Sequence, residues 1–203
     1  LGCSDGFDLL GDLTENIEFY KKAADLGNSK AATKFAYYQS KKGEIDDALK
    51  YFEMAAKNND STAIYNYLAL LHQSNKCNKE NMEKVVGFYR SAIQSGDVQS
   101  MLNLAELFEE GDDFIDENLD EAKKLYKMAS DCGNSEGSLN YGRILEEKMN
   151  DISGAIQFYQ LAMDEGNSNA MVSIARALMK INGDTEIILE LIRKSINEGN
   201  ADG

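Results

Sequence analysis

The sequence predicts an all-α fold, a right-handed α-solenoid of antiparallel helix pairs. Two observations carry this prediction. One short pattern of residues recurs along nearly the whole chain at intervals of 32 to 37 residues, and a period of this size is typical of stacked repeats. Within each copy, small and large residues are spaced as on one face of a helix. The 203 residues are 43% hydrophobic and 28% charged, a composition of globular rather than disordered chains.

The recurring pattern begins with an aromatic residue and ends seven residues later with glycine. Its first copy runs from Tyr20 to Gly27 with the sequence YKKAADLG. Glycine, and next asparagine, suits the left-handed turn that ends many helices, so each copy is predicted to end a helix. The last copy has lost its aromatic residue. The copies end at Gly27, Asn59, Gly96, Gly133, Gly166 and Gly199.

A second helix is predicted after each of these residues. Four residues further on stands a small residue and eight residues further on a large apolar one, as in Gly137 and Tyr141. Both lie on one helical face, where small side chains let a neighbouring helix approach closely. We call the helix after the glycine helix A and the helix that ends at the next glycine helix B. Asp46, Asp151 and Asp184 are expected to cap helices B.

All the variation in repeat length lies between helices A and B, where residues 75–84 and 111–121 form the long connections. The first helix B is expected at about residues 14–26, after a stub of a preceding unit at residues 7–11. We therefore expect a single repeat array over residues 1–203, with about five full repeats and partial repeats at both ends, as a fragment of a longer protein. Uncapped ends of an array expose apolar surface, so weak self-association through the ends is expected.

The chain resembles the Sel1-like repeat family, a branch of the tetratricopeptide-type α-solenoids. One copy of the family pattern is Ala122, Tyr126, Ala129 and Gly133, and the next copy repeats it at Ala155, Tyr159, Ala162 and Gly166. Loops of unequal length favour this family over tetratricopeptide repeats proper, whose period is a steady ~34 residues. The absence of proline departs from the family pattern. The resemblance implies an adaptor role in signalling, cell-cycle or ubiquitin-ligase complexes.

Charge and cysteine usage exclude several classes of protein. The formal net charge is −14, and an acidic chain without a dense basic run repels phosphate, so no nucleic-acid partner is expected. No apolar run approaches the roughly 18 residues of a membrane helix, so no membrane insertion is expected. Cys3, Cys77 and Cys132 fit neither a disulfide framework nor a zinc site, which favours a reducing, cytoplasmic location.

The sequence predicts no catalytic residue, no metal site and no cofactor. A nucleophile pair of His72 and Cys77 would lack an orienting carboxylate. The acidic loop at residues 111–118 lacks the alternating order of a calcium-binding loop, and no phosphate-binding glycine motif is present. The tyrosines that recur with the repeat are assigned to packing between helices.

The candidate site is the concave surface, which helix A lines in solenoids of this type. Seven residues past the residue that ends helix B, three successive copies carry Asn66, Asn103 and Asn140. These amides either hydrogen-bond an extended partner peptide or satisfy the helix backbone. Ten residues past it, two copies carry Arg143 and Arg176, which either grip a carboxylate or phosphate or form a solvated face.

The function expected from these observations is a non-enzymatic scaffold or adaptor that binds a partner protein or peptide on the concave helix-A face. The alternative is a lumenal adaptor of endoplasmic-reticulum quality control, which the glycosylation motif Asn59-Asp60-Ser61 permits. A hydrolase-like enzyme is the third interpretation. A signal sequence at the N-terminus of the full-length protein would separate the first two, and an assay of turnover would test the third.

Overall fold

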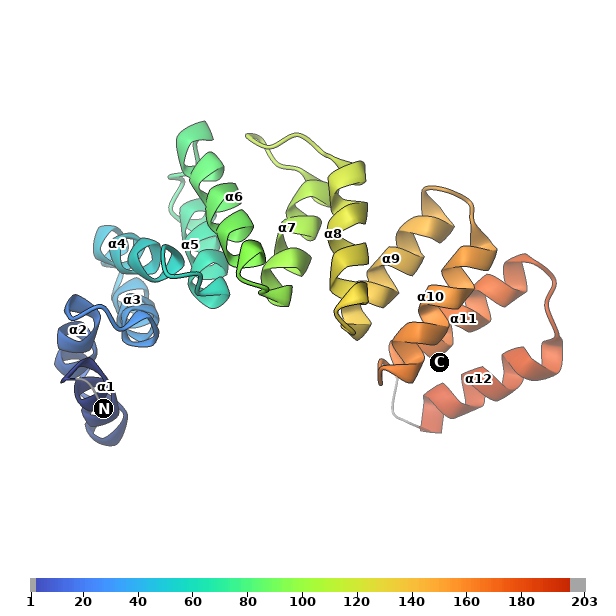
Figure 1. Ribbon diagram of the computed structural model, residues 1–203, viewed down its shortest axis with the longest axis horizontal. Helices are drawn as coiled ribbons and strands as arrows, with labels where there is room; N and C mark the ends of the chain where they lie inside the picture. Colours follow the sequence, from blue (N-terminus) through green and yellow to red (C-terminus); the bar gives the residue numbers. More distant parts are fainter. Residues whose placement is uncertain (1–2, 198–203) are drawn as a thin grey trace. The chain divides into compact units, whose positions relative to one another are not determined.

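The computed structural model describes residues 3–197, and over this range the chain is helical, with no strand (Figure 1). The predicted all-α fold and the alternation of helices A and B are confirmed: odd-numbered helices are helices A and even-numbered helices are helices B. In order they are α1 (Cys3–Thr14), α2 (Ile17–Asp25), α3 (Ser29–Lys42), α4 (Ile45–Ala56), α5 (Ser61–Gln73), α6 (Lys79–Gln94), α7 (Val98–Glu110), α8 (Leu119–Asp131), α9 (Ser135–Glu147), α10 (Ile152–Asp164), α11 (Asn169–Lys180) and α12 (Thr185–Asn197).

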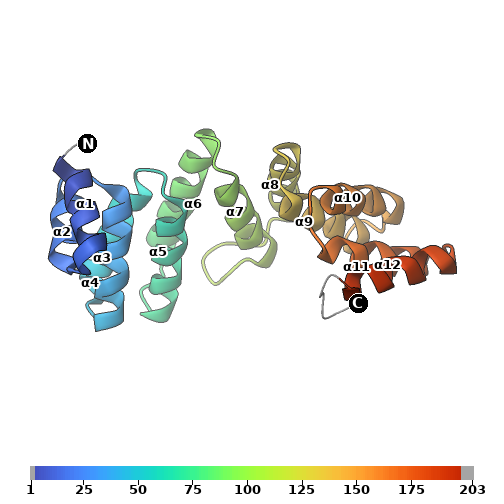
Figure 2. The same ribbon diagram turned by 90° about the horizontal axis from the view of Figure 1, so that it is seen from below.

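The helices form two units. The N-terminal unit comprises residues 1–103 and 111–116, and the C-terminal unit comprises residues 104–110 and 117–203. In the N-terminal unit, helices α1 to α5 each pack against the next one along the chain, as Figure 2 also shows. Helices α8 to α12 do the same in the C-terminal unit. Packing between sequence neighbours is the property that defines a helical-repeat fold.

The residues predicted to end helices B have the expected left-handed backbone. Gly27 has a φ of 91° and Gly166 a φ of 92°, and Gly96 and Gly133 are also positive. Asn59, where the repeat has no glycine, has a φ of 61°. The last predicted position, Gly199, lies outside the described residues. These turns reverse the chain after each helix B, so that the next helix A packs back on it.

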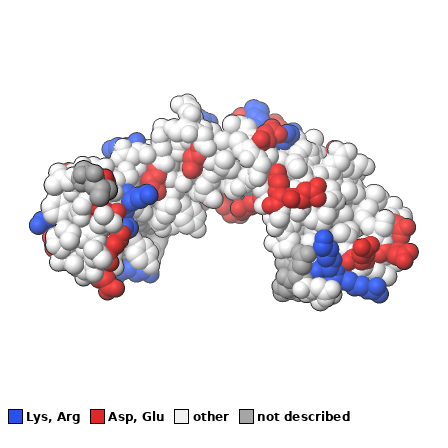
Figure 3. Space-filling view, turned by 60° about the horizontal axis from the view of Figure 1, so that its bottom comes forward, with Lys and Arg blue, Asp and Glu red and all other residues white. Residues whose placement is uncertain are grey.

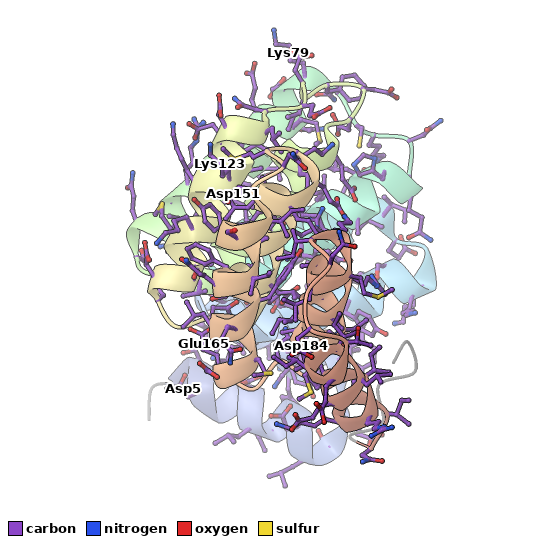
Figure 4. All side chains as sticks on the ribbon, turned by 90° about the vertical axis from the view of Figure 1, so that its right-hand side faces the viewer. Asp5, Lys79, Lys123, Asp151, Glu165 and Asp184 are labelled. Atoms are coloured by element: carbon purple, nitrogen blue, oxygen red, sulfur yellow. The ribbon has the colours of Figure 1, made fainter. Side chains whose placement is uncertain are left out.

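Two of the three predicted caps are confirmed. The side chain of Asp151 accepts a hydrogen bond from the Gly154 backbone N–H at 2.9 Å, and Figure 4 shows Asp151 and Glu165 at opposite ends of α10. Asp184 accepts from the Glu186 backbone N–H at 2.7 Å. The prediction for Asp46 was wrong, because Asp46 lies inside the first turn of α4 and forms an ion pair with Lys76.

The prediction for the first helix B was also wrong at its start. Thr14 ends α1, and α2 begins at Ile17, because Glu15 has a left-handed φ of 51° that no helix interior accepts. Residues 7–11 are therefore the interior of a helix A rather than a stub. Gly11 fixes how α1 and α2 pack, since a Cβ on it would lie 2.5 Å from the Tyr20 ring.

The small residues of the repeat allow the close helix contacts that the spacing predicted. A Cβ on Gly137 would lie 2.6 Å from the Ala129 Cβ, and a Cβ on Gly142 would lie 2.8 Å from the Tyr159 ring. Tyr126 and Tyr159 are both buried. The recurring tyrosines thus fill the space between helices, as expected of core residues.

Candidate functional site

The five predicted site residues lie on helices A and are accessible to solvent. Asn66 on α5 and Asn103 on α7 belong to the N-terminal unit and are half-buried. Asn140 and Arg143 on α9 are half-buried and Arg176 on α11 is exposed, all three in the C-terminal unit. The five residues are therefore divided between the two units. Within each unit, we call the solvent-facing side of its helices A the helix-A surface of that unit.

The side-chain amides of the three asparagines form few hydrogen bonds within their own helices. Asn66 donates from Nδ2 to the Thr62 backbone oxygen at 2.8 Å, and the Asn103 Oδ1 accepts from Gln99 Nε2 at 2.9 Å. Asn140 forms no hydrogen bond with another residue of the described chain. Each amide has at least one group left, so satisfaction of the helix and binding of a partner are compatible.

Arg143 has a structural role that the sequence did not suggest. Its guanidinium donates two hydrogen bonds to the Glu109 carboxylate, both at 2.7 Å. Glu109 also accepts from the Tyr126 hydroxyl at 3.1 Å. The hydrogen bonds with Arg143 are the main reason that the pKa of Glu109 is lowered, and those with Glu109 are the main reason that the pKa of Arg143 is raised. Arg143 therefore joins α9 to the end of α7. Arg176 forms no ion pair within residues 3–197 and stays available.

The same arrangement occurs at two further contacts between consecutive helices A. Glu146 on α9 accepts from the Tyr159 hydroxyl at 2.7 Å and pairs with Lys180 on α11 at 2.6 Å. We call this arrangement a junction cluster: a helix-A carboxylate, a helix-B tyrosine hydroxyl and a cation from the next helix A. The three clusters are Asp12–Tyr20–Lys34, Glu109–Tyr126–Arg143 and Glu146–Tyr159–Lys180.

Burial of these hydroxyl groups perturbs their ionisation. Burial, with the hydrogen bond to Asp12 second, raises the pKa of Tyr20 to about 12. The pKa values of Tyr126 and Tyr159 are raised too, first by burial and then by their carboxylate partners. The tyrosines remain neutral donors at physiological pH, so each carboxylate keeps both of its partners.

The contact between α3 and α5 lacks a junction cluster. Thirteen residues past Gly27, where Glu109 and Glu146 stand in their repeats, α3 carries Ser40. The helix-B aromatic residue is Phe52, which has no hydroxyl, and the position of Arg143 is taken by Ala69. A pocket of about 200 Å³ is found there instead, lined by Tyr37, Ser40, Lys41, Phe52, Asn66, Ala69, Leu70 and Gln73.

His72, considered with Cys77 as a nucleophile pair, has a carboxylate neighbour. The sequence predicts no carboxylate beside His72, but Asp112 Oδ2 lies 3.7 Å from His72 Nε2. Asp112 also orders its own loop, because its Oδ1 accepts from the backbone N–H groups of Phe114 and Ile115, both at 2.7 Å. Burial and the charges of Asp112 and Asp113 raise the pKa of the Cys77 thiol. A raised pKa keeps the sulfur protonated, which is the opposite of what a nucleophilic cysteine needs.

Three further expectations from the sequence concern glycosylation, membrane insertion and nucleic-acid binding. In the glycosylation motif, Asn59 donates a hydrogen bond from Nδ2 to Ser95 Oγ at 2.9 Å. Within the described part of the chain, no helix is long and apolar enough to cross a membrane. On the face shown in Figure 3, acidic and basic side chains are interspersed without a broad basic field.

Comparisons with known proteins agree with this fold. The family model described as Sel1 repeat matches residues 1–28, 35–60, 98–134 and 139–167, more than half of the chain. No curated protein matches the sequence.

Three solved structures illustrate the likeness. A Sel1 repeat protein from Oxalobacter formigenes is 20% identical, with a TM-score of 0.70, over 97% of this chain and 83% of its own. YrrB, a TPR protein with an unusual peptide-binding site, is 16% identical, with a TM-score of 0.55, over 92% of this chain and 95% of its own. The immunity protein Pa5087 from Pseudomonas aeruginosa is 17% identical, with a TM-score of 0.53, over 92% of this chain and 74% of its own. At these identities the likeness shows the fold alone.

Proposed function

Because the chain belongs to the Sel1 repeat family, we propose that it is a non-enzymatic scaffold that binds a segment of a partner protein on the helix-A surface. The observation that carries the proposal is that this surface has accessible polar side chains with hydrogen-bonding groups not satisfied by the chain itself. Asn66 keeps its Oδ1 free, and within the described chain the Asn140 side chain forms no hydrogen bond and Arg176 no ion pair. An extended peptide offers backbone donors and acceptors that side-chain amides of this kind bind.

Two further observations support the proposal over an enzyme. The raised pKa of Cys77 leaves the cluster around His72 without an activated nucleophile. YrrB, one of the proteins with this fold, has a peptide-binding site, which by analogy favours the same use of the fold here. Arg143 is no longer part of the proposed binding set, because its guanidinium is held by Glu109.

We place this adaptor in the cytoplasm. Cys3 and Cys132 are exposed free thiols, and Cys77 is also unpaired. Thiols of this kind persist in a reducing compartment. The asparagine on which the lumenal alternative rests, Asn59, donates its Nδ2 to Ser95 Oγ in the folded chain.

The proposal is tested by selecting a phage-displayed library of random peptides against the chain and measuring the selected peptides by fluorescence polarisation. The double variant Asn66→Ala/Arg176→Glu alters the helix-A surface in both units. We expect it to weaken binding at least about tenfold, the effect of one lost charge-assisted hydrogen bond. The control variant Arg90→Glu reverses an exposed charge on α6, a helix B. Selected peptides that respond to Arg90→Glu but not to the double variant would contradict the proposal.

A further inference from the structure

The pocket between α3 and α5 has the size and floor of a site for one apolar side chain. Its floor contains Phe52 and Leu70, which are 2% and 4% exposed. Ala69 and the ring of Tyr37 also line it. Its volume of about 200 Å³ is below the roughly 300–1,000 Å³ of sites for small-molecule ligands. A single aliphatic side chain fits this space better than a cofactor does.

The rim of the pocket supplies hydrogen-bonding groups for a peptide backbone. Asn66 donates its Nδ2 to Thr62 of its own helix, which orients the side chain and leaves Oδ1 free. Gln73, two turns further along α5, has no hydrogen bond to another residue in the described range. The two amides lie on the same helical face. Together they offer donors and acceptors to the N–H and C=O groups that flank a bound side chain.

The lining of the pocket includes one cation and no carboxylate. Lys41 is the charged residue of its lining, and its Nζ lies 5.2 Å from the centroid of the Tyr37 ring. It has no ion pair with a described residue. Helix α3 carries four lysines and no acidic residue, and α5 carries no Asp, Glu, Lys or Arg. One of these lysines, Lys34, is paired with Asp8 and Asp12, so the positive charge at the pocket itself is that of Lys41.

The pocket lies at the repeat positions that form the Glu109–Tyr126–Arg143 cluster in the C-terminal unit. Ser40 stands for the carboxylate, Phe52 for the tyrosine and Ala69 for the cation. In the C-terminal unit the corresponding space holds the ion pair of Glu109 and Arg143 at 2.7 Å. Removing only one member would leave a charge without its partner, which is costly. The joint replacement leaves an open space with neutral walls and one free cation at its edge.

We infer that this pocket binds a segment of a partner protein in which an apolar side chain is flanked by an acidic residue. The apolar side chain fills the pocket, the neighbouring carboxylate pairs with Lys41, and the backbone bonds Asn66 and Gln73. The inference rests on the proposed function and gives the chemistry of the partner.

The test uses ¹⁵N NMR titration of the whole chain with synthetic heptapeptides. The probe is acetyl-GSELEGS-amide, whose leucine is flanked by glutamates. Matched peptides replace the leucine with alanine, or both glutamates with glutamine or with lysine. The side-chain amide signals of Asn66 and Gln73 report directly on the pocket. We expect both signals to shift with the leucine–glutamate peptide, at a dissociation constant on the order of a millimolar or below. The lysine peptide is expected to bind at least about tenfold more weakly.

Two pairs of variants separate the pocket from other surfaces. Ala69→Tyr fills the pocket and should weaken binding at least about tenfold. The control Arg90→Tyr places the same side chain at an exposed position of α6, a helix B, and should leave binding unchanged. Ala69 is exposed, and a tyrosine already stands at this repeat position in α3 as Tyr37. Lys41→Gln should weaken binding about threefold to tenfold, and Lys42→Gln less than twofold.

The outcomes distinguish this inference from the proposed function. If phage-selected peptides bind the helix-A surface but Ala69→Tyr and Lys41→Gln leave their affinity unchanged, the pocket inference is wrong and the scaffold proposal stands. If neither the selected peptides nor the heptapeptide binds at several millimolar, both are wrong. Shifts of Asn66 and Gln73 that depend on leucine, glutamate and Lys41 support the inference.

Discussion

The contacts between consecutive helices A differ in whether charged side chains meet there. At the α7–α9 and α9–α11 contacts of the C-terminal unit, carboxylates and cations pair with each other and with a buried tyrosine. At the α3–α5 contact of the N-terminal unit, the corresponding residues are small or uncharged and a pocket opens. The same surface of a repeat can therefore stabilise the array or remain free for a partner. A charged residue on the helix-A surface can be assigned to partner binding only after its ion pairs within the array have been identified.

The largest effect is expected from overpacking the C-terminal unit. Ala129→Leu places a large side chain against Gly137, where there is no room even for a Cβ. We expect it to lower the free energy of unfolding by about 3 kcal/mol, measured by urea denaturation. Protection from hydrogen exchange should fall first in α8 and α9, because repeats couple mainly to their neighbours. The control Ala69→Leu makes the same change at an exposed position. Equal losses for the two variants would contradict this account of the packing.

The next effect concerns the junction cluster of Arg143. Glu109→Gln removes the carboxylate from a half-buried guanidinium and should cost about 2 kcal/mol in the free energy of unfolding. The matched control is Glu147→Gln, because Glu147 lies 3.8 Å from the same guanidinium and is 53% exposed. Loss of this partner should cost less than about 0.5 kcal/mol. A larger loss for the control would show that Arg143 is not held mainly by Glu109.

The same cluster predicts a dependence of stability on pH. The pKa of Glu109 is lowered in the folded chain, chiefly by its hydrogen bonds with Arg143. A lowered pKa contributes stability above the unfolded value of about 4.3, and this contribution is lost as pH falls through the folded value. Between about pH 5 and pH 3, the free energy of unfolding should therefore fall less in Glu109→Gln than in the unmodified chain. Parallel pH profiles from urea denaturation would contradict the role given to Glu109.

The smallest effect is expected from building an ion pair into the open contact. Ser40→Glu and Ala69→Arg together place a carboxylate and a cation where the C-terminal unit has Glu109 and Arg143. Because Phe52 offers no hydroxyl and the site is solvated, the coupling energy from a double-mutant cycle should be only about 0.5–1 kcal/mol. The double variant should also lose binding of the heptapeptide. If the double variant still binds the heptapeptide, the peptide does not occupy the space that the new ion pair fills.

The repeat architecture was predictable from the sequence because each helix pair carries its own signals. The left-handed position at Gly27 or Gly166 and the small residue at Gly137 are local requirements that recur in every copy. Helix starts were less predictable. Asp46 and Asp151 are both predicted to cap a helix, but only Asp151 does. The position of Asp151, eight residues before the helix-B aromatic residue, is that of Glu44 at the start of α4, so Asp46 lies inside the helix.

The junction clusters were not predictable from one sequence. Arg143 and Glu109 are 34 residues apart, and spacing within a helix shows only that positions ten and thirteen share a face. Which side chains of one helix A contact those of the next depends on how far the two helices are shifted and rotated relative to each other. The pocket follows from the same offset, so its lining by Ser40, Phe52 and Ala69 became apparent only in three dimensions.

The bonds between tyrosines and carboxylates also give the protein an optical signal of its own folding. With ten tyrosines and no tryptophan, its near-ultraviolet absorption is that of tyrosine. Burial raises the pKa of Tyr20 and of Tyr51 to about 12, so the neutral hydroxyl contributes stability below the unfolded value of about 10, and this contribution is lost as pH rises through 12. An alkaline titration should therefore record tyrosinate absorbance and loss of helix together. Tyr37, on the pocket wall, is one of these ten fluorophores, so a ligand in the pocket is expected to change part of the tyrosine emission of the chain.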